Sequence, residues 1–165
     1  MFNKKSLSVP VALVSLGLLG TSAAQADDTH CYTNASIKGS YALVTSYSVD
    51  ALALGLRYFD GEGNMTGTFT LNEPVAGSPT GAREIVTGTQ VGTYTVNCDG
   101  TGTITRTLTS STGVVSQAMD NFLITKATRR DGHLLATALE DMQQTPSALV
   151  PGGTFVFRSY TRRPD

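Results

Sequence analysis

The sequence is poor in the side chains that many enzymes and metal sites use. It has no tryptophan, two cysteines, two histidines, and 15% charged residues. A Ser–His–Asp centre or a zinc site with three or four ligands would have little to draw on. No G-x-S-x-G nucleophile motif occurs, and no glycine-rich segment leads from a strand into a helix as phosphate-binding loops do. We therefore assign no catalytic residue, no metal and no cofactor from the sequence.

Long apolar runs are also missing, with one exception near the N-terminus. Residues 7–19 are mostly apolar, follow two lysines and precede the small-x-small sequence of residues 24–26. The run is shorter than the ~20 residues that span a bilayer, and the pattern is typical of a cleaved Sec-type signal peptide. We predict a signal peptide at residues 1–26 and a β-domain at residues 27–165 that is periplasmic or secreted. A retained membrane anchor is the alternative.

An excess of positive charge is absent from the mature chain. Without residues 1–26 it keeps 10 basic and 13 acidic residues, a net charge of −3. A mildly acidic protein has no electrostatic reason to bind nucleic acid or an anionic membrane. Because no further apolar run approaches membrane-spanning length, we expect a soluble product without membrane association. No pattern in the sequence defines an oligomeric state.

The two cysteines, Cys31 and Cys98, predict one disulfide, because the periplasm and the cell exterior are oxidising. The bond would close a loop of 67 residues, which stabilises a fold by roughly 4 kcal/mol in the chain-entropy account. The alternative is a reactive thiol or a metal site with His30. That site would lack ligands, since the only other histidine in the sequence is His133.

Threonine, glycine and β-branched residues are what the mature chain has in abundance. Residues 92–109 show the pattern best, with two alternating threonine-rich runs around the turn at residues 97–100. Similar runs separated by turn residues recur along the chain. They lie at residues 37–48, 51–60, 65–72, 83–97, 114–126, 134–141 and 154–163. The run at 134–141 also has helical propensity, but hairpin signals on both sides favour a strand.

About eight such strands, joined by short connections, predict an all-β fold. The simplest arrangement is a single antiparallel up-and-down barrel, because closure of the sheet removes its exposed edges. A two-sheet β-sandwich of the same strands is the alternative.

Charges on predicted inner faces are the feature that could indicate a site. Burying an unpaired charge is costly, so inward charges must be paired or must line a wet cavity. Arginines in a lumen could orient a carboxylate-bearing or polar ligand. The alternatives are structural Arg–Asp pairs, or a register shift of one residue that turns every side chain outward. The candidate ligand-binding residues are Arg57, Arg106, Asp120, Arg158 and Tyr160.

Three other charged groups are not assigned to a site. Residues 60–64 begin with the oxygen spacing of a calcium loop but lack its later glycine and glutamate. Glu140 and Asp141 are adjacent, so on a strand they point to opposite faces. Arg162 and Arg163, near the C-terminus, are expected in a solvated tail.

Three segments carry a resemblance to a known group of proteins. They are IKGSYAL (residues 37–43), YFDGEGNMTGTF (58–69) and GTYTVNCDGTGTIT (92–105). They resemble segments of uncharacterised secreted small β-barrel proteins of bacteria, which are similar in layout to calycin-like and allene-oxide-cyclase-like barrels. The resemblance covers most of the mature chain through short turn motifs. It implies a barrel and transfers no catalytic residue.

Three functions fit these observations. The first is a barrel that binds a small apolar or amphipathic ligand in its lumen. The second is an enzyme of cyclase or isomerase type that uses the lumen as a reaction chamber. The third is a structural or interaction protein with a packed barrel. A cavity with converging polar groups favours the first two, and a filled interior favours the third.

Overall fold

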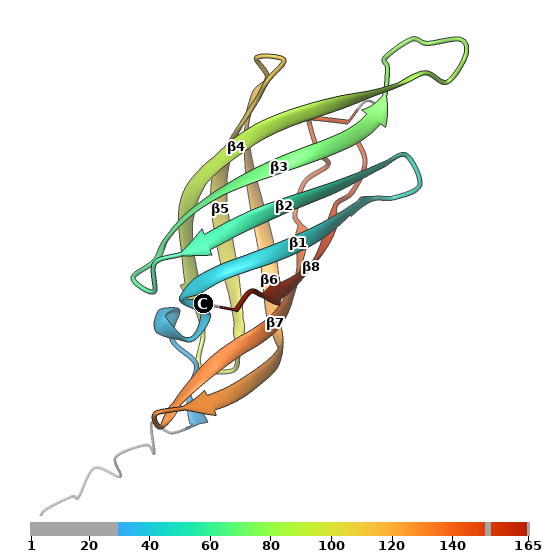
Figure 1. The fold of residues 1–165 in the computed structure, drawn as a ribbon. Coiled ribbons are helices and arrows are strands. Elements are labelled where there is room, and N and C mark those ends of the chain that lie inside the picture. The colour runs from blue at the N-terminus through green and yellow to red at the C-terminus, as the bar shows by residue number, and fades with distance from the viewer. Residues whose placement is uncertain (1–29, 151–152, 165) are drawn as a thin grey trace, which may run out of the picture.

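Each strand pairs with the strands before and after it in the sequence, and the last strand returns to the first (Figure 1). The computed structural model describes residues 30–150 and 153–164. The eight antiparallel strands form a closed up-and-down barrel, which confirms the predicted fold and rules out the sandwich. The predicted signal peptide lies outside the described residues. Within them, no helix has the length and apolar character needed to cross a membrane.

The strand boundaries follow the predicted runs, with differences of up to four residues at their ends. The elements are η2 (Asn34–Ile37), β1 (Gly39–Tyr47), β2 (Ala51–Phe59), β3 (Asn64–Pro74), β4 (Arg83–Val96), β5 (Thr101–Ser110), β6 (Val115–Arg130), β7 (His133–Gln143) and β8 (Phe157–Arg162). The first predicted strand begins later because η2, a single 3₁₀ turn, takes its first residues. The sixth is longer than predicted, and the eighth starts three residues later. The segment with helical propensity is a strand, because β6 and β8 pair with it on both sides.

The segment before β1 is fixed to one end of the barrel. Within it, the Thr33 amide donates to Ser36 Oγ (3.1 Å) and the Ser36 amide donates to the Thr33 carbonyl (2.9 Å), which closes the 3₁₀ turn. The predicted disulfide joins Cys31 to Cys98 in the β4–β5 turn. Next to it, the Tyr32 amide donates to the Cys98 carbonyl (3.1 Å). A disulfide-linked chain is compatible with the periplasm or the cell exterior.

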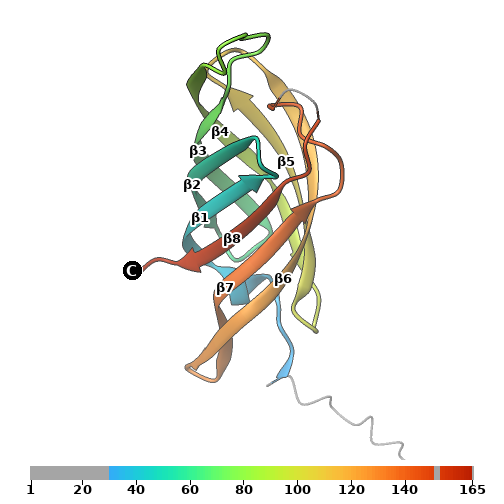
Figure 2. The same ribbon diagram turned by 90° about the vertical axis from the view of Figure 1, so that its right-hand side faces the viewer.

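The β6–β7 hairpin extends beyond the neighbouring strands at this same end (Figures 1 and 2). Its turn is Asp131-Gly132, with φ of 51° and 82°. Two successive residues with positive φ are typical of a type I′ turn, for which Asp-Gly is a favoured pair. The register shifts around Lys126, midway along the hairpin. The β7 strand of this hairpin contacts η2 and forms a wall beside it.

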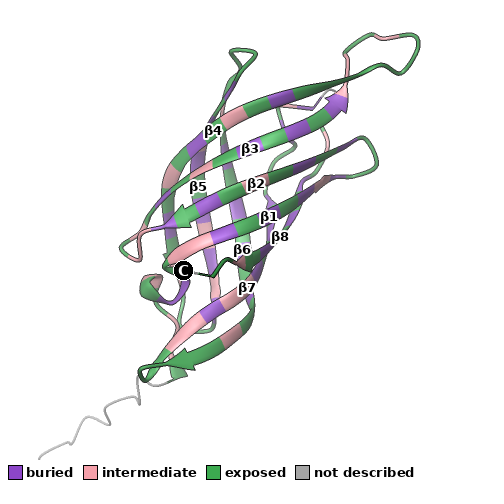
Figure 3. Cartoon of the chain, viewed as in Figure 1, coloured by how far each residue is buried: buried purple, intermediate pink, exposed green. Residues whose placement is uncertain are grey.

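Buried and exposed residues alternate along most of the barrel, as Figure 3 shows, whereas residues 125–130 of β6 include none that is buried. Two apolar clusters occupy the two ends of the lumen. The cluster near η2 includes Ile37, Tyr41, Phe59, Tyr94, Ile104 and Phe122. The cluster at the far end includes Tyr47, Phe69, Leu71, Leu108, Val150 and Val156. Charged side chains lie between them, and these form the candidate site.

Two glycines make room for the large interior side chains. Gly67 faces Arg57 across β2–β3, and a Cβ at Gly67 would lie 3.1 Å from the Arg57 Cγ. Gly92 faces Arg106 across β4–β5, and a Cβ there would lie 2.8 Å from the Arg106 Cα. Glycine inside a strand often marks such a close approach. The glycines in these strands therefore belong to the interior packing around the arginines.

Candidate functional site

All five residues that alternation placed inward meet at one level of the barrel. They are Arg57 on β2, Arg106 on β5, Asp120 on β6, and Arg158 and Tyr160 on β8, each at most 3% exposed. Three buried residues that sequence reasoning did not single out complete the group: Gln90 on β4, and Asp141 and Gln143 on β7. We call these eight residues the charge layer.

Asp120 lies among three guanidinium groups. Arg106 binds it in bidentate fashion, with Nε donating to Oδ2 (2.6 Å) and Nη2 to Oδ1 (3.1 Å). Arg158 Nη1 also donates to Oδ1 (3.1 Å), and Arg57 Nη2 lies 3.7 Å from Oδ2. Bidentate, charge-assisted bonds of this kind are the strongest hydrogen bonds that side chains form.

Asp141 is the second anion of the layer. Arg158 Nη1 donates to its Oδ1 (2.7 Å), so that Arg158 bridges the two carboxylates. Arg57 Nη1 donates to Asp141 Oδ2 (3.1 Å). The Tyr160 hydroxyl donates to the same Oδ2 and accepts a hydrogen bond from Arg57 Nη1. Burial raises the pKa of Tyr160 well above its ordinary value, so the phenol keeps the proton that it donates.

Two amide side chains accept further hydrogen bonds from the three arginines. Gln90 Oε1 accepts from Arg57 Nη2 (3.0 Å). Gln143 Oε1 accepts from Arg106 Nη2 (3.1 Å) and from Arg158 Nη2 (3.2 Å). Arg57 Nε and Arg106 Nη1 are fully buried donors of the layer that have no hydrogen-bond partner among the described residues. The arginines are therefore bound mainly to other side chains of the layer.

The charges of the layer hold one another in the ionised state. Burial alone would raise the pKa of Asp120, but the charge of Arg158 and the hydrogen bond from Arg106 lower it below its ordinary value. Burial would lower the pKa of Arg158, but the carboxylates of Asp141 and Asp120 raise it. Burial also lowers the pKa of Arg106, and the like charges of Arg158 and Arg57 lower it further. The layer is thus a fixed network of ionic and hydrogen-bonded side chains that joins six strands.

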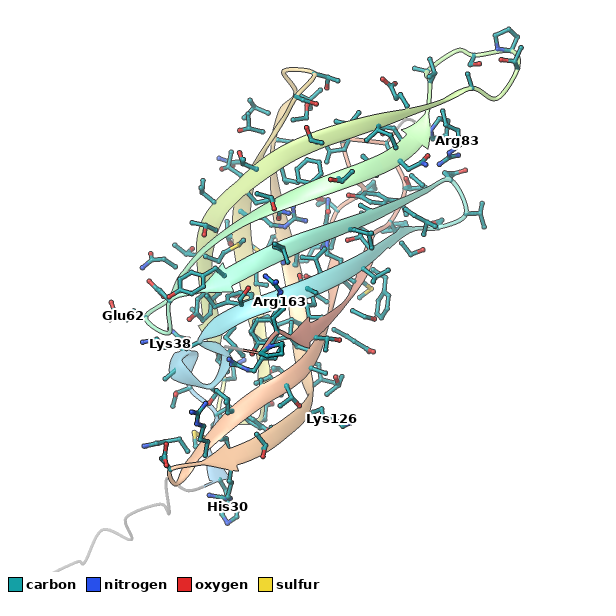
Figure 4. All side chains as sticks on the ribbon, in the orientation of Figure 1. His30, Lys38, Glu62, Arg83, Lys126 and Arg163 are labelled. Atoms are coloured by element: carbon teal, nitrogen blue, oxygen red, sulfur yellow. A yellow bond between two sulfur atoms is a disulfide. The ribbon has the colours of Figure 1, made fainter. Side chains whose placement is uncertain are left out.

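A separate hollow lies where η2 meets the barrel. This mouth cleft has a volume of about 740 Å³. Its walls are the segment around η2, the end of β2, the tip of the β6–β7 hairpin and the end of β8. Lys38, which lies beside η2 in Figure 4, lines the cleft together with Arg130, His133 and Arg162. Asp131 is the one acidic side chain among its lining residues.

Arg162 is held in a defined position at this cleft. Its Nε donates to the Ala136 carbonyl (2.7 Å), and Nη2 donates to the Lys38 carbonyl and to the Tyr41 hydroxyl. Its guanidinium also lies 4.9 Å from the centre of the Tyr41 ring. A Cβ on Gly39, whose φ is 129°, would overlap Arg162 Nη1. The expectation of a solvated tail was therefore wrong for Arg162, which the strand pairing of β8 brings into the wall.

The far end of the lumen carries two acidic side chains in register. Glu73 on β3 pairs with Glu84 on β4. Glu73 is buried and its Oε2 has no hydrogen-bond partner among the described residues, whereas Glu84 is exposed. Burial raises the pKa of Glu73, and the charge of Glu84 raises it further. Glu73 is therefore a destabilising group when it is ionised.

We expect Glu73→Gln to stabilise the protein at pH 7. The pKa of Glu73 is raised in the folded state, so the protonated carboxyl favours folding at pH values below its unfolded pKa of about 4.3. This contribution is lost as pH rises through the folded pKa. The gain should shrink as pH falls toward 4. Chemical unfolding at several pH values measures it, with Glu62→Gln in the exposed β2–β3 turn as the control. A variant no more stable than the wild type at pH 7 would contradict the prediction.

The acidic turn at residues 60–64 uses its carboxylate internally. Asp60 Oδ1 accepts from the amides of Glu62, Gly63 and Asn64, and Oδ2 accepts from Asn64 Nδ2. These bonds, the one from the Asn64 side chain foremost, lower the pKa of Asp60 to about 2. The segment is the β2–β3 turn, as expected.

Comparisons with protein-family models, with curated proteins and with solved structures found no match to this chain. The resemblance to secreted bacterial barrels of calycin-like layout therefore stays an expectation. The fold and the site define the class of protein as a small, disulfide-linked, closed eight-stranded β-barrel with an ionic interior.

Proposed function

We propose that the protein is an exported binding barrel that holds a small amphipathic anion, such as a carboxylate with an apolar tail, in the mouth cleft. The cleft carries the proposal. Its volume of about 740 Å³ is within the range of small-molecule sites, roughly 300–1,000 Å³. It combines cationic side chains with apolar ones, namely Tyr58, Leu134 and Leu135. The disulfide supports the location outside the cytoplasm.

The cations suit the recognition of an anionic head group. Lys38, Arg130 and Arg162 give the cleft three positive charges against the single negative charge of Asp131. Arg162 is already fixed by its backbone acceptors, so little side-chain entropy is lost when it donates to a carboxylate. Leu134 and Leu135 are half-buried in the absence of a ligand, and an apolar tail would cover their remaining surface.

The contacts of the interior arginines favour the mouth over the lumen as the ligand site. Arg57, Arg106 and Arg158 are bound to Asp120 and Asp141. A ligand in the lumen would have to displace these partners, and the freed buried charges would cost several kcal/mol. In the mouth cleft, Lys38 is exposed, and the acceptors of Arg162 are carbonyls and a hydroxyl rather than carboxylates.

Titration with octanoate, followed by amide NMR shifts, tests the proposal. We expect shifts at Leu134, Leu135 and Lys38, and weaker binding of 1-octanol, which lacks the charge. Lys38→Gln should weaken octanoate binding about threefold, as expected for a solvent-accessible ion pair. The matched control is Lys126→Gln on β6, an exposed lysine that does not line the cleft.

Two results would count against a carboxylate site in the cleft. One is the absence of shifts in these residues at millimolar octanoate. The other is an equal loss of affinity in the two lysine variants, which would indicate a general charge effect.

A further inference from the structure

The outer surface of the barrel has two faces of different chemistry. On β3, β4 and β5 most outward positions are threonine. They are Thr66, Thr68, Thr70, Thr87, Thr89, Thr93, Thr95, Thr103, Thr105, Thr107 and Thr109. Large apolar side chains point outward on β2, β1, β8 and the adjoining part of β7, and further ones lie on β4 (Ile85, Val91) and on β6 (Val115, Met119, Leu123). We call six residues of the first group the apolar face: Val44, Leu52, Leu54, Leu56, Met142 and Phe157.

The strand register makes the apolar face continuous. Leu54 pairs with Val44 across β1–β2. In the next row, Ser46 on β1 pairs with Leu52 on one side and with Phe157 of β8 on the other. Phe157 in turn pairs with Met142 of β7. The six apolar side chains are between 41% and 64% exposed. Single exposed apolar residues are ordinary on protein surfaces, whereas a contiguous patch marks an interaction site.

Charge is almost absent from this face. No charged residue occupies an outward position of β1 or β2, or an outward position of β8 within the face. Glu140, between Leu139 and Asp141 on β7, is the one charged side chain at the edge of the face. Such a face meets an identical copy without like-charge repulsion, which is the main penalty in self-association.

We propose that the apolar face is the contact surface of a two-fold symmetric homodimer. Counted at roughly 200 Å² for each large side chain, the exposed parts of the six residues amount to roughly 600 Å². Ala42, Ser46 and Ser159, which lie between them, bring the face close to the roughly 800 Å² per partner of a standard interface. The dimer packs two sheets face to face at an angle of about 30°, as in β-sandwiches.

The symmetry places one residue near the axis. β1 lies between β2 and β8, so Val44 is near the centre of the face, and in a two-fold contact a central residue meets its own copy. A two-fold contact uses the same face on both copies and is closed, so the association stops at two copies. This inference is independent of the proposed ligand site, because none of the six residues lines the mouth cleft.

Light scattering during size-exclusion chromatography at about 100 μM protein tests the dimer. We expect twice the monomer mass for the wild type and the monomer mass for Leu54→Lys. The control is Thr105→Lys, at an exposed outward position on β5, which should remain dimeric. Circular dichroism of both variants verifies that the barrel is folded.

Cross-linking gives a second, independent measurement. The native cysteines are bonded to each other, so Val44→Cys supplies the one free thiol of the described chain. Its oxidation should yield a dimer on a non-reducing gel, and Thr105→Cys should yield none. A monomeric wild type at 100 μM overturns the proposal. The proposal is also overturned if the protein binds phosphatidylcholine vesicles as a monomer and Leu54→Lys abolishes this binding, because the partner would then be a lipid surface.

Discussion

Asp120→Asn should cost about 3–5 kcal/mol of the free energy of unfolding, the usual result of removing one partner from a buried ion network. Asp120 is fully buried, and three arginines lie within 3.7 Å of its carboxylate oxygens. Without its charge, one carboxylate remains for three guanidinium groups. The matched control is Glu140→Gln, an exposed carboxylate on the outer side of β7, which should change stability by less than ~0.5 kcal/mol.

The same substitution should alter the pH dependence of stability. The pKa of Asp120 is lowered in the folded state, so its contribution is complete above the unfolded pKa of about 3.9 and is lost as pH falls below it. The wild type should therefore lose stability in acid more steeply than Asp120→Asn. Urea denaturation between pH 7 and pH 3 measures both effects.

A second variant keeps this prediction testable if Asp120→Asn does not fold. Replacing Arg106 and Asp120 together by methionine and leucine removes a bidentate pair without leaving either charge alone. Apolar replacement of a complete buried pair is often neutral or stabilising. Equal stability losses in Asp120→Asn and Glu140→Gln would show that the charge layer contributes little.

Removing the disulfide should cost roughly 4 kcal/mol, because the bond closes a loop of 67 residues in the unfolded chain. Cys31→Ala, Cys98→Ala and the double variant should lose the same amount, since either substitution breaks the bond. The strands should remain paired, because none of the strand pairs includes residues 30–37. Denaturation with and without a reducing agent measures the cost in the wild type.

The bond also positions one wall of the mouth cleft. Cys31 lines the cleft, and the adjacent Tyr32 lies against Gly100 at the base of the β4–β5 turn. The cysteine variants should therefore bind octanoate more weakly than the wild type. If the cysteine variants lost the expected stability but bound octanoate as tightly as the wild type, the disulfide would stabilise the fold without positioning the cleft.

Part of the charge layer could be predicted from the sequence, because alternation groups some of its charged residues with apolar residues that are buried. Arg106 follows Ile104 and precedes Leu108 at intervals of two, and all three are buried. For β2 the hydrophobic pattern was ambiguous. The more apolar set, which contains Leu54, faces outward, whereas the set with Arg57 faces the lumen. Because the interior is ionic here and the exterior is apolar, the rule that apolar residues are buried does not identify the inner face of β2.

Other parts of the site carried little signal in the sequence. Gln90 and Gln143 are neutral, so nothing in the alternation of their strands distinguishes them from surface amides. Asp141 stands next to Glu140 in a segment that also had helical propensity, and its inward direction follows only from the register of β7. The mouth cleft depends on the length of β6 and on the register shift at Lys126, which no local pattern encodes.

Closure of the barrel has a consequence for the order of folding. Tyr41 on β1 bonds to Arg162 on β8, 121 positions along the chain. Contacts between positions so far apart form slowly, because the loop-closure entropy is lost before the contact is gained. Arg158, which bridges the two buried carboxylates, arrives with the same strand. A ribosome that synthesises this chain must therefore release nearly all of it before Asp120 and Asp141 can acquire their common cation.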